Sequence, residues 1–207
     1  NGAHTSMVLG AYLAGQDIVR DCMKDDVIRG YMNQAIYKEI IPTLTLPEEE
    51  LMSFAASVTD RFQNPFIDHA LLSISLNSTA KWKARVLPSL EGYLEKTGQV
   101  PPCLSASLAF YLAFYKGIGF VDATFTGDRN VKNQYPISDD PKVLEFYDAH
   151  KDDSAADYVH AVLSETSFWG KDLTTLAGLE ETVVKDFTFI QEKGCYELMK
   201  QIVNAAE

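Results

Sequence analysis

The sequence predicts an all-α domain, because apolar residues recur at helical spacing along most of the chain. Glycine and proline clusters separate these runs. The 207 residues are 46% hydrophobic and carry a net charge of −11, which suits one large packed domain and disfavours nucleic acid as a partner. The sequence has no Gly-x-Gly-x-x-Gly phosphate loop, so we expect this chain by itself to bind no nucleotide cofactor.

Helical patterns in the first half are expected in the order His4–Leu13, Asp25–Ile41, Pro47–Phe62, Asn64–Leu72 and Thr79–Lys96. The first helix is apolar on every side and should be buried, and Pro42 should end the second. In the third, the acids that follow Pro47 suit the helix dipole, and the inward face consists of Leu51, Phe54, Ala55, Val58 and Phe62. Asn77 should cap the last helix, which Pro88 should kink or break.

The second half begins with a strongly apolar segment, Cys103–Lys116, which we place at the centre of the core. Glycines and turn residues in Gly117–Asp139 predict a long loop, with a short hairpin around residues 121–125. Helices should follow from Asp140-Pro141 and over Ala155–Leu163. The clearest pattern is a C-terminal stripe of more than 25 residues, made by Leu176, Leu179, Val183, Phe187, Ile190, Leu198 and Ile202.

The cysteines and histidines are widely scattered, so we expect reduced thiols, a cytoplasmic protein and no bound metal. No apolar stretch approaches the roughly 20 residues that a membrane-spanning helix needs. The chain begins with Asn and enters a helical pattern at once, with no leader. We interpret it as a piece of a longer protein.

Two groups of residues could carry chemistry. Asn1 and His4 are three residues apart at a helix start and share one face. Lys81 and Arg85 are i, i+4 neighbours, which would give an acidic protein one basic face suited to a carboxylate or a hydroxyl-rich ligand. A capping Asn with a surface His, and solvated charges on the second helix, are the alternatives.

These residues lie in stretches that resemble the mannitol dehydrogenase family of polyol-specific long-chain dehydrogenases. Asn1 and His4 fit the last two named positions of that family's Lys-x-x-x-x-Asn-x-x-His motif, so its lysine would precede Asn1 by five residues. Other similar stretches are AIYKEIIPTL, RFQNPFIDH, LLSISLNSTAKWKARVLPSL and WGKDLTTLAGL.

The resemblance implies a multi-helix C-terminal domain, similar to that of 6-phosphogluconate dehydrogenase, which closes over the substrate of an NAD-dependent oxidoreductase acting on CH–OH groups. It implies an upstream Rossmann domain for NAD that this chain lacks. Within the family the similarity is greatest to members that interconvert tagaturonate and altronate in hexuronate breakdown. Fructuronate reduction or another polyol dehydrogenation is the alternative, and a helical oligomerisation domain is the non-enzyme alternative.

The resemblance also implies roles for residues of this chain. The upstream lysine is the general acid/base, Asn1 donates a hydrogen bond to the reacting oxygen, and His4 holds a substrate hydroxyl. Lys81 lies where the family keeps a basic residue, and we expect it to meet the substrate carboxylate, together with Arg85. Ser73 replaces an arginine of the mannitol-type members and would make room for that end of a sugar acid.

Overall fold

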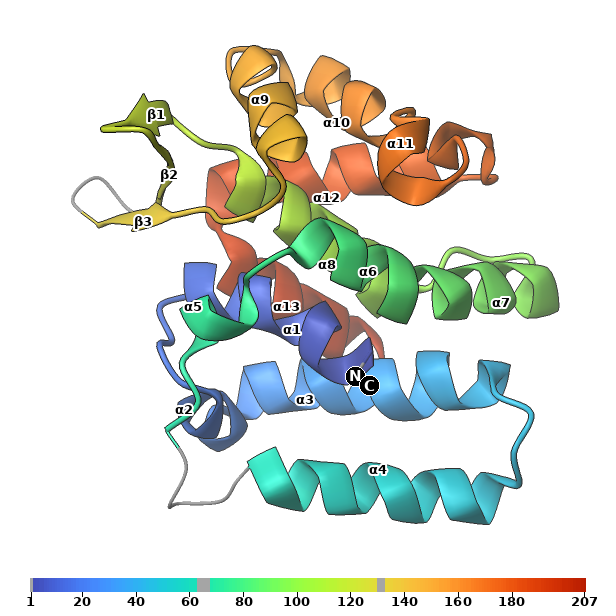
Figure 1. The fold of residues 1–207 in the computed structure, drawn as a ribbon. Coiled ribbons are helices and arrows are strands. Elements are labelled where there is room, and N and C mark those ends of the chain that lie inside the picture. Colours follow the sequence, from blue (N-terminus) through green and yellow to red (C-terminus); the bar gives the residue numbers. More distant parts are fainter. Residues whose placement is uncertain (1, 63–67, 130–132) are drawn as a thin grey trace.

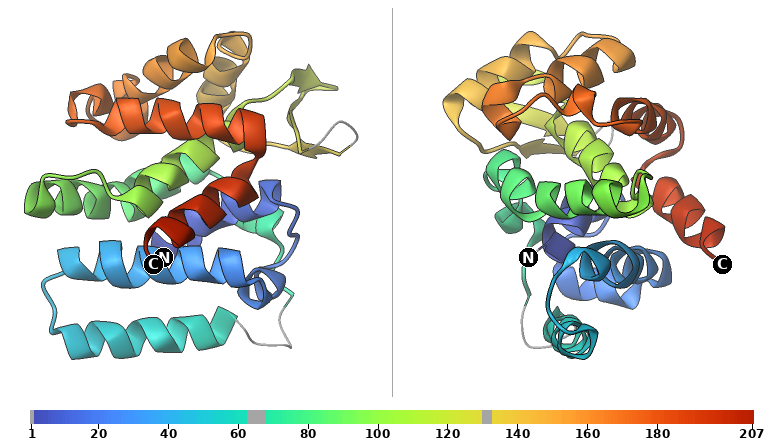
Figure 2. Two further views of the ribbon diagram at one scale, coloured as in Figure 1. Left: turned by 180° about the vertical axis from the view of Figure 1, so that it is seen from behind. Right: turned by 90° about the vertical axis from the view of Figure 1, so that its right-hand side faces the viewer.

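The computed structural model describes residues 2–62, 68–129 and 133–207, and most of them are helical. The helices stack in layers (Figure 1), and the view from behind shows the same order (Figure 2). The apolar helix α8 (Pro102–Tyr115) runs through the middle, between α1 (Gly2–Leu13) and α12 (Leu179–Lys193). The predicted helical class and the central helix are therefore confirmed.

The predicted helix over Asp25–Ile41 is present but changes type along its length. It comprises α3 (Asp26–Gln34), the π-helix η1 (Ala35–Ile40) and the 3₁₀ turn η2 (Ile41–Thr43). Pro42 lies inside η2, so the helical segment does not end at this proline as expected. The wider π turn still buries Ala35 and Ile36, and it also turns Glu39 into the core, where its side chain is 1% exposed. The short helix α2 (Val19–Lys24) precedes this segment.

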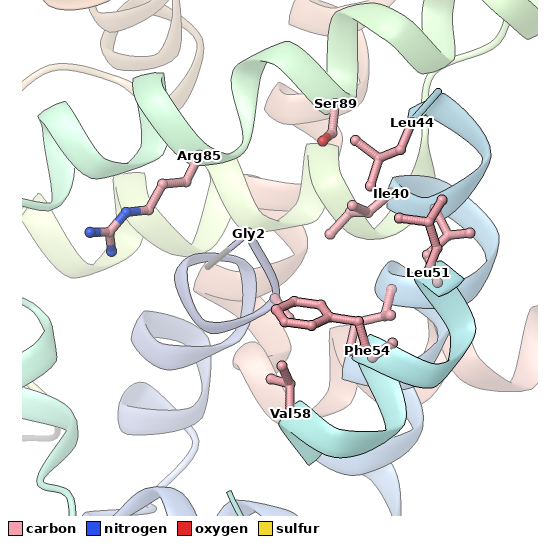
Figure 3. Close-up of a pocket in the computed structure, with 12 residues that line it drawn as sticks. Gly2, Ile40, Leu44, Leu51, Phe54, Val58, Arg85 and Ser89 are labelled. Carbon is pink, nitrogen blue, oxygen red and sulfur yellow. The ribbon is translucent and has the colours of Figure 1, made fainter. Parts of the chain in front are cut away.

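Helix α4 (Glu48–Phe62) lies at the outer edge of the molecule (Figures 1 and 2). Leu51 and Ala55 are buried as predicted, but the expectation for Phe54 is wrong, because its side chain is 64% exposed. Neighbouring elements cover α4 on one side only. Part of its apolar face, including Phe54, is therefore left exposed. An apolar groove of about 260 Å³ runs between α4, η1 and the start of α1 (Figure 3).

The stretch predicted as a helix over Asn64–Leu72 differs from expectation. Residues 63–67 lie outside the described part of the chain, and 68–70 are not helical: Ala70 forms an antiparallel bridge with Ile18. Helix α5 begins only at Leu71 and spans Leu71–Ile74. The helix predicted over Thr79–Lys96 breaks at Val86 as expected, giving α6 (Ser78–Arg85) and α7 (Leu87–Thr97).

The segment expected to be a long loop is more ordered than predicted. It forms an antiparallel sheet in the order β1 (Gly119–Val121), β2 (Thr124–Asp128) and β3 (Gln134–Pro136). Asp122 and Ala123, both with positive φ, make the turn of the predicted hairpin. Tyr135 of β3 is buried and donates a hydrogen bond to the carbonyl of Phe114 at 2.7 Å, which ties the sheet to α8.

The C-terminal half contains α9 (Pro141–Ala149), α10 (Ala155–Leu163), α11 (Thr166–Trp169), the 3₁₀ turn η3 (Leu173–Thr175), α12 and α13 (Cys195–Ala205). The long stripe is two helices, because Gly194 adopts a φ of 92° that ends α12. The residues of α12 in the stripe are buried within the domain, so this part of the stripe offers no exposed oligomerisation surface. Within the described ranges, no helix is both long and apolar enough to cross a membrane.

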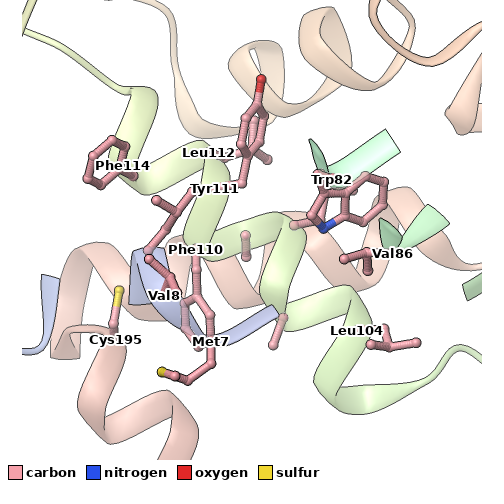
Figure 4. Close-up of a cluster of buried hydrophobic side chains, with 14 of the residues drawn as sticks. Met7, Val8, Trp82, Val86, Leu104, Phe110, Tyr111, Leu112, Phe114 and Cys195 are labelled. Carbon is pink, nitrogen blue, oxygen red and sulfur yellow. The ribbon is translucent and has the colours of Figure 1, made fainter. Parts of the chain in front are cut away.

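The core is densely aromatic (Figure 4). Trp82 and Trp169 are each 1% exposed and meet edge to face with ring centroids 5.4 Å apart. Helix α1 comes so near α8 that a Cβ at Gly10 would lie 2.6 Å from the ring of Phe110. A glycine is therefore required at this crossing. All three cysteines are buried and unbridged, as predicted.

Candidate functional site

Of the two predicted site residues at the beginning of the sequence, one can be described. Asn1 is outside the described residues, so its predicted role stays a prediction. His4 occupies the first turn of α1 and is half-buried. Burial, with smaller contributions from the neighbouring His69 and Arg85, lowers the pKa of His4 to about 4. At neutral pH its imidazole is therefore uncharged, with one nitrogen that can donate and one that can accept a hydrogen bond.

His69 lies beside His4. The two rings meet edge to face with centroids 6.0 Å apart. The backbone holds this position: the His69 carbonyl accepts a hydrogen bond from Val19 N at 2.9 Å, and the preceding Asp68 pairs with Arg20 at 2.7 Å. His69 is exposed, so its ring is accessible from solvent at the edge of the site.

Helix α6 presents Lys81 and Arg85, as their spacing predicts. Lys81 is half-buried, and its ammonium donates a 2.7 Å hydrogen bond to the carbonyl of Ile74 at the end of α5. The exposed Ser73 immediately precedes this carbonyl. Burial lowers the pKa of Lys81 and Arg85 lowers it further, whereas Asp139 raises it.

Arg85 connects the two parts of the site. A Cβ at Gly2 would lie 3.0 Å from the Arg85 carbonyl, so the start of α1 rests directly on the end of α6. The Arg85 side chain is exposed and extends away from the apolar groove (Figure 3). Since Arg85 affects the pKa of both His4 and Lys81, we treat His4, His69, Lys81 and Arg85 as one basic cluster.

The apolar groove adjoins this basic cluster. Gly2, Ala3 and Ile40 line it, together with the exposed side chains of Phe54 and Leu44. The other lining residues are Ile36, Ile41, Leu51, Ala55, Val58, Arg85 and Ser89. A ligand at the cluster would therefore meet cationic and imidazole groups on one side and apolar surface on the other.

The start of α6 departs from the sequence interpretation. Asn77 is at the cap position with a φ of 55°, but its side chain makes no capping hydrogen bond. The carboxylate of Asp139 takes this role instead, because it accepts from Thr79 N at 3.4 Å and from Thr79 Oγ1 at 2.9 Å. Nothing in the local sequence marked Asp139, which lies at the end of the expected loop.

The cluster combines a neutral imidazole, a second imidazole, an ammonium group and a guanidinium. Such a set can bind a carboxylate through the cations and hydroxyl groups through the imidazoles. In a chain of net charge −11, a local basic face also favours an anionic ligand at this one place.

Comparisons with known proteins identify the chains to which this one is similar. Altronate oxidoreductase of Klebsiella pneumoniae is 42% identical over 208 residues, which cover 98% of this chain and 41% of the relative. The Yersinia enterocolitica altronate oxidoreductase is 41% identical, covering 94% of this chain and 39% of the relative. This chain thus spans about two fifths of the length of these curated relatives.

A solved structure shares the fold. Pseudomonas fluorescens mannitol 2-dehydrogenase, solved as a ternary complex with NAD and D-mannitol, is 19% identical and superposes with a TM-score of 0.83. The superposition covers 99% of this chain and 39% of that one. The family model described as mannitol dehydrogenase C-terminal domain matches residues 1–191. The chain therefore belongs to the mannitol dehydrogenase C-terminal domain family.

Proposed function

We propose that this chain is the substrate-side C-terminal domain of a tagaturonate reductase (altronate oxidoreductase), which interconverts D-tagaturonate and D-altronate in hexuronate catabolism. The observation that carries the proposal is the basic cluster at the start of α1. Its cations match the carboxylate of a sugar acid, and its imidazoles match the hydroxyls. The names of the relatives at 41–42% identity support the same substrate.

Each residue of the site has one role in this proposal. Asn1 donates a hydrogen bond to the oxygen of the reacting carbonyl or alkoxide, and the charge that develops on that oxygen is thereby stabilised. His4 holds a hydroxyl of the substrate, and its neutral state lets it donate or accept. Lys81, with Arg85, binds the carboxylate, while the small exposed Ser73 leaves space beside Lys81.

We propose that NAD is held by an upstream Rossmann domain, and that the catalytic lysine lies five residues before Asn1. When bound, NAD supplies hydride transfer to or from the substrate carbon. The length of the relatives supports a second domain, as does the exposed apolar rim of the groove beside the site. The free, buried thiols support a reducing, cytoplasmic location.

Another sugar substrate of the same family is the alternative. Fructuronate carries the same carboxylate, so the basic cluster alone does not separate it from tagaturonate, whereas mannitol and fructose carry none. We expect the cations to favour uronates over uncharged polyols.

The test uses the full-length protein, with NADH oxidation measured against D-tagaturonate, fructuronate and fructose. Lys81→Ala should lower kcat/KM for tagaturonate by about 10–100-fold, as loss of a charge-assisted hydrogen bond predicts. The matched control is Lys83→Ala, because Lys83 lies on the same helix and faces Gly170, on the side of α11. It should change kcat/KM by less than about twofold.

The outcomes separate the alternatives. Turnover of fructuronate but not tagaturonate would replace the proposed substrate and keep the site. Unchanged kcat and KM in Lys81→Ala would remove Lys81 from the carboxylate site. No turnover of any of these substrates by the wild type would overturn the proposed activity.

A further inference from the structure

Asp139 lies at the centre of a hydrogen-bond network that joins three distant parts of the chain. Its Oδ2 accepts from Thr79 N, from Thr79 Oγ1 and, at 2.5 Å, from the hydroxyl of Tyr115 on α8. The preceding residue adds a backbone bond, from Asn77 N to the Ser138 carbonyl at 3.0 Å. The first turn of α6 is therefore held from outside its own sequence, by a residue 60 positions away.

Buried tyrosines surround this point and limit how far it can move. The Tyr115 hydroxyl also accepts from Ser78 N at 3.1 Å, and the Tyr111 hydroxyl lies 2.6 Å from Thr79 Oγ1. Tyr147 in turn donates to Tyr111 at 2.7 Å. All three tyrosines are at most 1% exposed, so the start of α6 is anchored to the rigid centre of the core.

Lys81 follows Thr79 by two residues on α6, so the contacts that fix the first turn of the helix also fix the position of Lys81. Its ammonium is directed to the Ile74 carbonyl, one helical element earlier, and this requires α5 and α6 to keep a fixed relation. The charged groups that act on Lys81 are Arg85 on its own helix and Asp139 from the loop after β3. The short helices α5 and α11, which carry the sequences LLSI and TSFW, bring no charge to it.

We infer that Asp139 is a positioning residue for substrate binding, which sets the place of Lys81 by holding the first turn of α6. This inference rests on the proposed function. It identifies a residue outside the basic cluster on which the affinity of the cluster for a carboxylate depends. Asp139 Oδ2 is itself engaged by the hydrogen bonds that it accepts from Thr79 and Tyr115. Its negative charge also favours the ammonium form of Lys81.

The neighbouring Asp140 offers a matched control. It is also a helix cap, since its Oδ1 accepts from Lys142 N at 2.9 Å at the start of α9. An Asp→Asn change removes one charge at either position and leaves one carbonyl acceptor. Only the change at position 139 alters the start of the helix that carries Lys81.

The experiment is a double-mutant cycle in the full-length enzyme with D-altronate and NAD. Asp139→Asn should raise KM for altronate about 5–20-fold with kcat changed by less than about threefold, since ground-state placement of a carboxylate contact is lost. Asp140→Asn should leave KM unchanged. In a Lys81→Met background, Asp139→Asn should have no further effect on kcat/KM, because its effect passes through Lys81.

A second readout does not depend on activity. With lysines reductively ¹³C-methylated, the NMR titration of Lys81 should move to lower pH in Asp139→Asn, since loss of a nearby negative charge disfavours the ammonium form. Additive effects in the cycle, or an unmoved Lys81 titration, would overturn the inference. A wild-type enzyme that is inactive on altronate would instead overturn the proposed function, and the NMR titration would still decide the role of Asp139.

Discussion

Helices α6 and α8 begin in the same unusual way, and they differ in what this beginning does. Neither N-cap residue caps its helix with a side chain: the Asn77 side chain makes no such bond, and Pro101 has no suitable group. Both helices instead receive a carboxylate from more than 50 positions away, Asp139 for α6 and Glu39 for α8. Each cap thereby joins two segments that are distant in the sequence.

The difference lies in depth and in neighbours. Glu39 is 1% exposed, and both its oxygens accept from backbone N–H groups of Cys103 and Leu104 at 2.9–3.0 Å. Asp139 is half-buried and has Lys81 as a charged neighbour. One type of contact thus serves the core at α8 and, on our proposal, the substrate at α6. On this proposal, the cap that serves substrate binding is the half-buried Asp139, and the fully buried Glu39 serves only the core.

Removal of the buried cap should have the largest effect on stability. Glu39→Ala leaves the first N–H groups of α8 buried without an acceptor, and we expect a loss of about 3 kcal/mol or more in the free energy of unfolding, measured by urea denaturation. The matched control, Glu49→Ala, removes an exposed acid from the first turn of α4 and should cost no more than about 1 kcal/mol. Equal losses would show that the Glu39 hydrogen bonds add nothing beyond a helix-dipole effect.

Asp186 can be compared with Glu39 and Asp139, because it is a partly buried acid that caps no helix. Among the described residues it accepts no hydrogen bond, and burial raises its pKa to about 7. A carboxyl group whose pKa is higher in the folded than in the unfolded state stabilises the fold at low pH, and this contribution is lost as pH rises from about 4 to 7. Asp186→Asn should therefore be more stable than the wild type by about 1–3 kcal/mol at pH 8, with no gain at pH 4. A stability difference that does not change with pH would contradict this assignment.

Much of the fold could be predicted because helical periodicity is a local property. The spacing of Ile28, Met32 and Ile36 reports burial, and the proline at position 88 reports a break, without knowledge of any partner. The π turn at Ala35–Ile40 could not be predicted in this way. Its apolar spacing resembles that of an α-helix, whereas its buried acid is satisfied by Cys103 and Leu104, 64 residues further along.

The candidate site likewise contains residues that local spacing predicts and residues that only tertiary contacts bring in. Lys81 and Arg85 are neighbours on one helix, so their spacing alone predicted a shared basic face. His69 joins the basic cluster through an edge-to-face ring contact with His4. Asp139 lies outside the cluster and is linked to α6 by a hydrogen bond that it accepts from Thr79. Asp139 is the last residue of the stretch expected to be a loop, and the β3 strand, which ends at Pro136, brings it to the start of α6.

The smallest expected effect tests whether Asp139, and not Asn77, caps α6. Asn77 adopts a φ of 55°, a conformation that glycine accepts at lower cost, and its own N–H is already bonded to Ser138. If the side chain contributes no cap, Asn77→Gly should raise the free energy of unfolding by about 0.5 kcal/mol. If the asparagine were the cap, the same change would lower it by a few tenths. The sign of this change in the free energy of unfolding, measured by urea denaturation beside Asp139→Asn, therefore decides which residue caps α6. Only substitution of the residue that caps the helix should lower the free energy of unfolding.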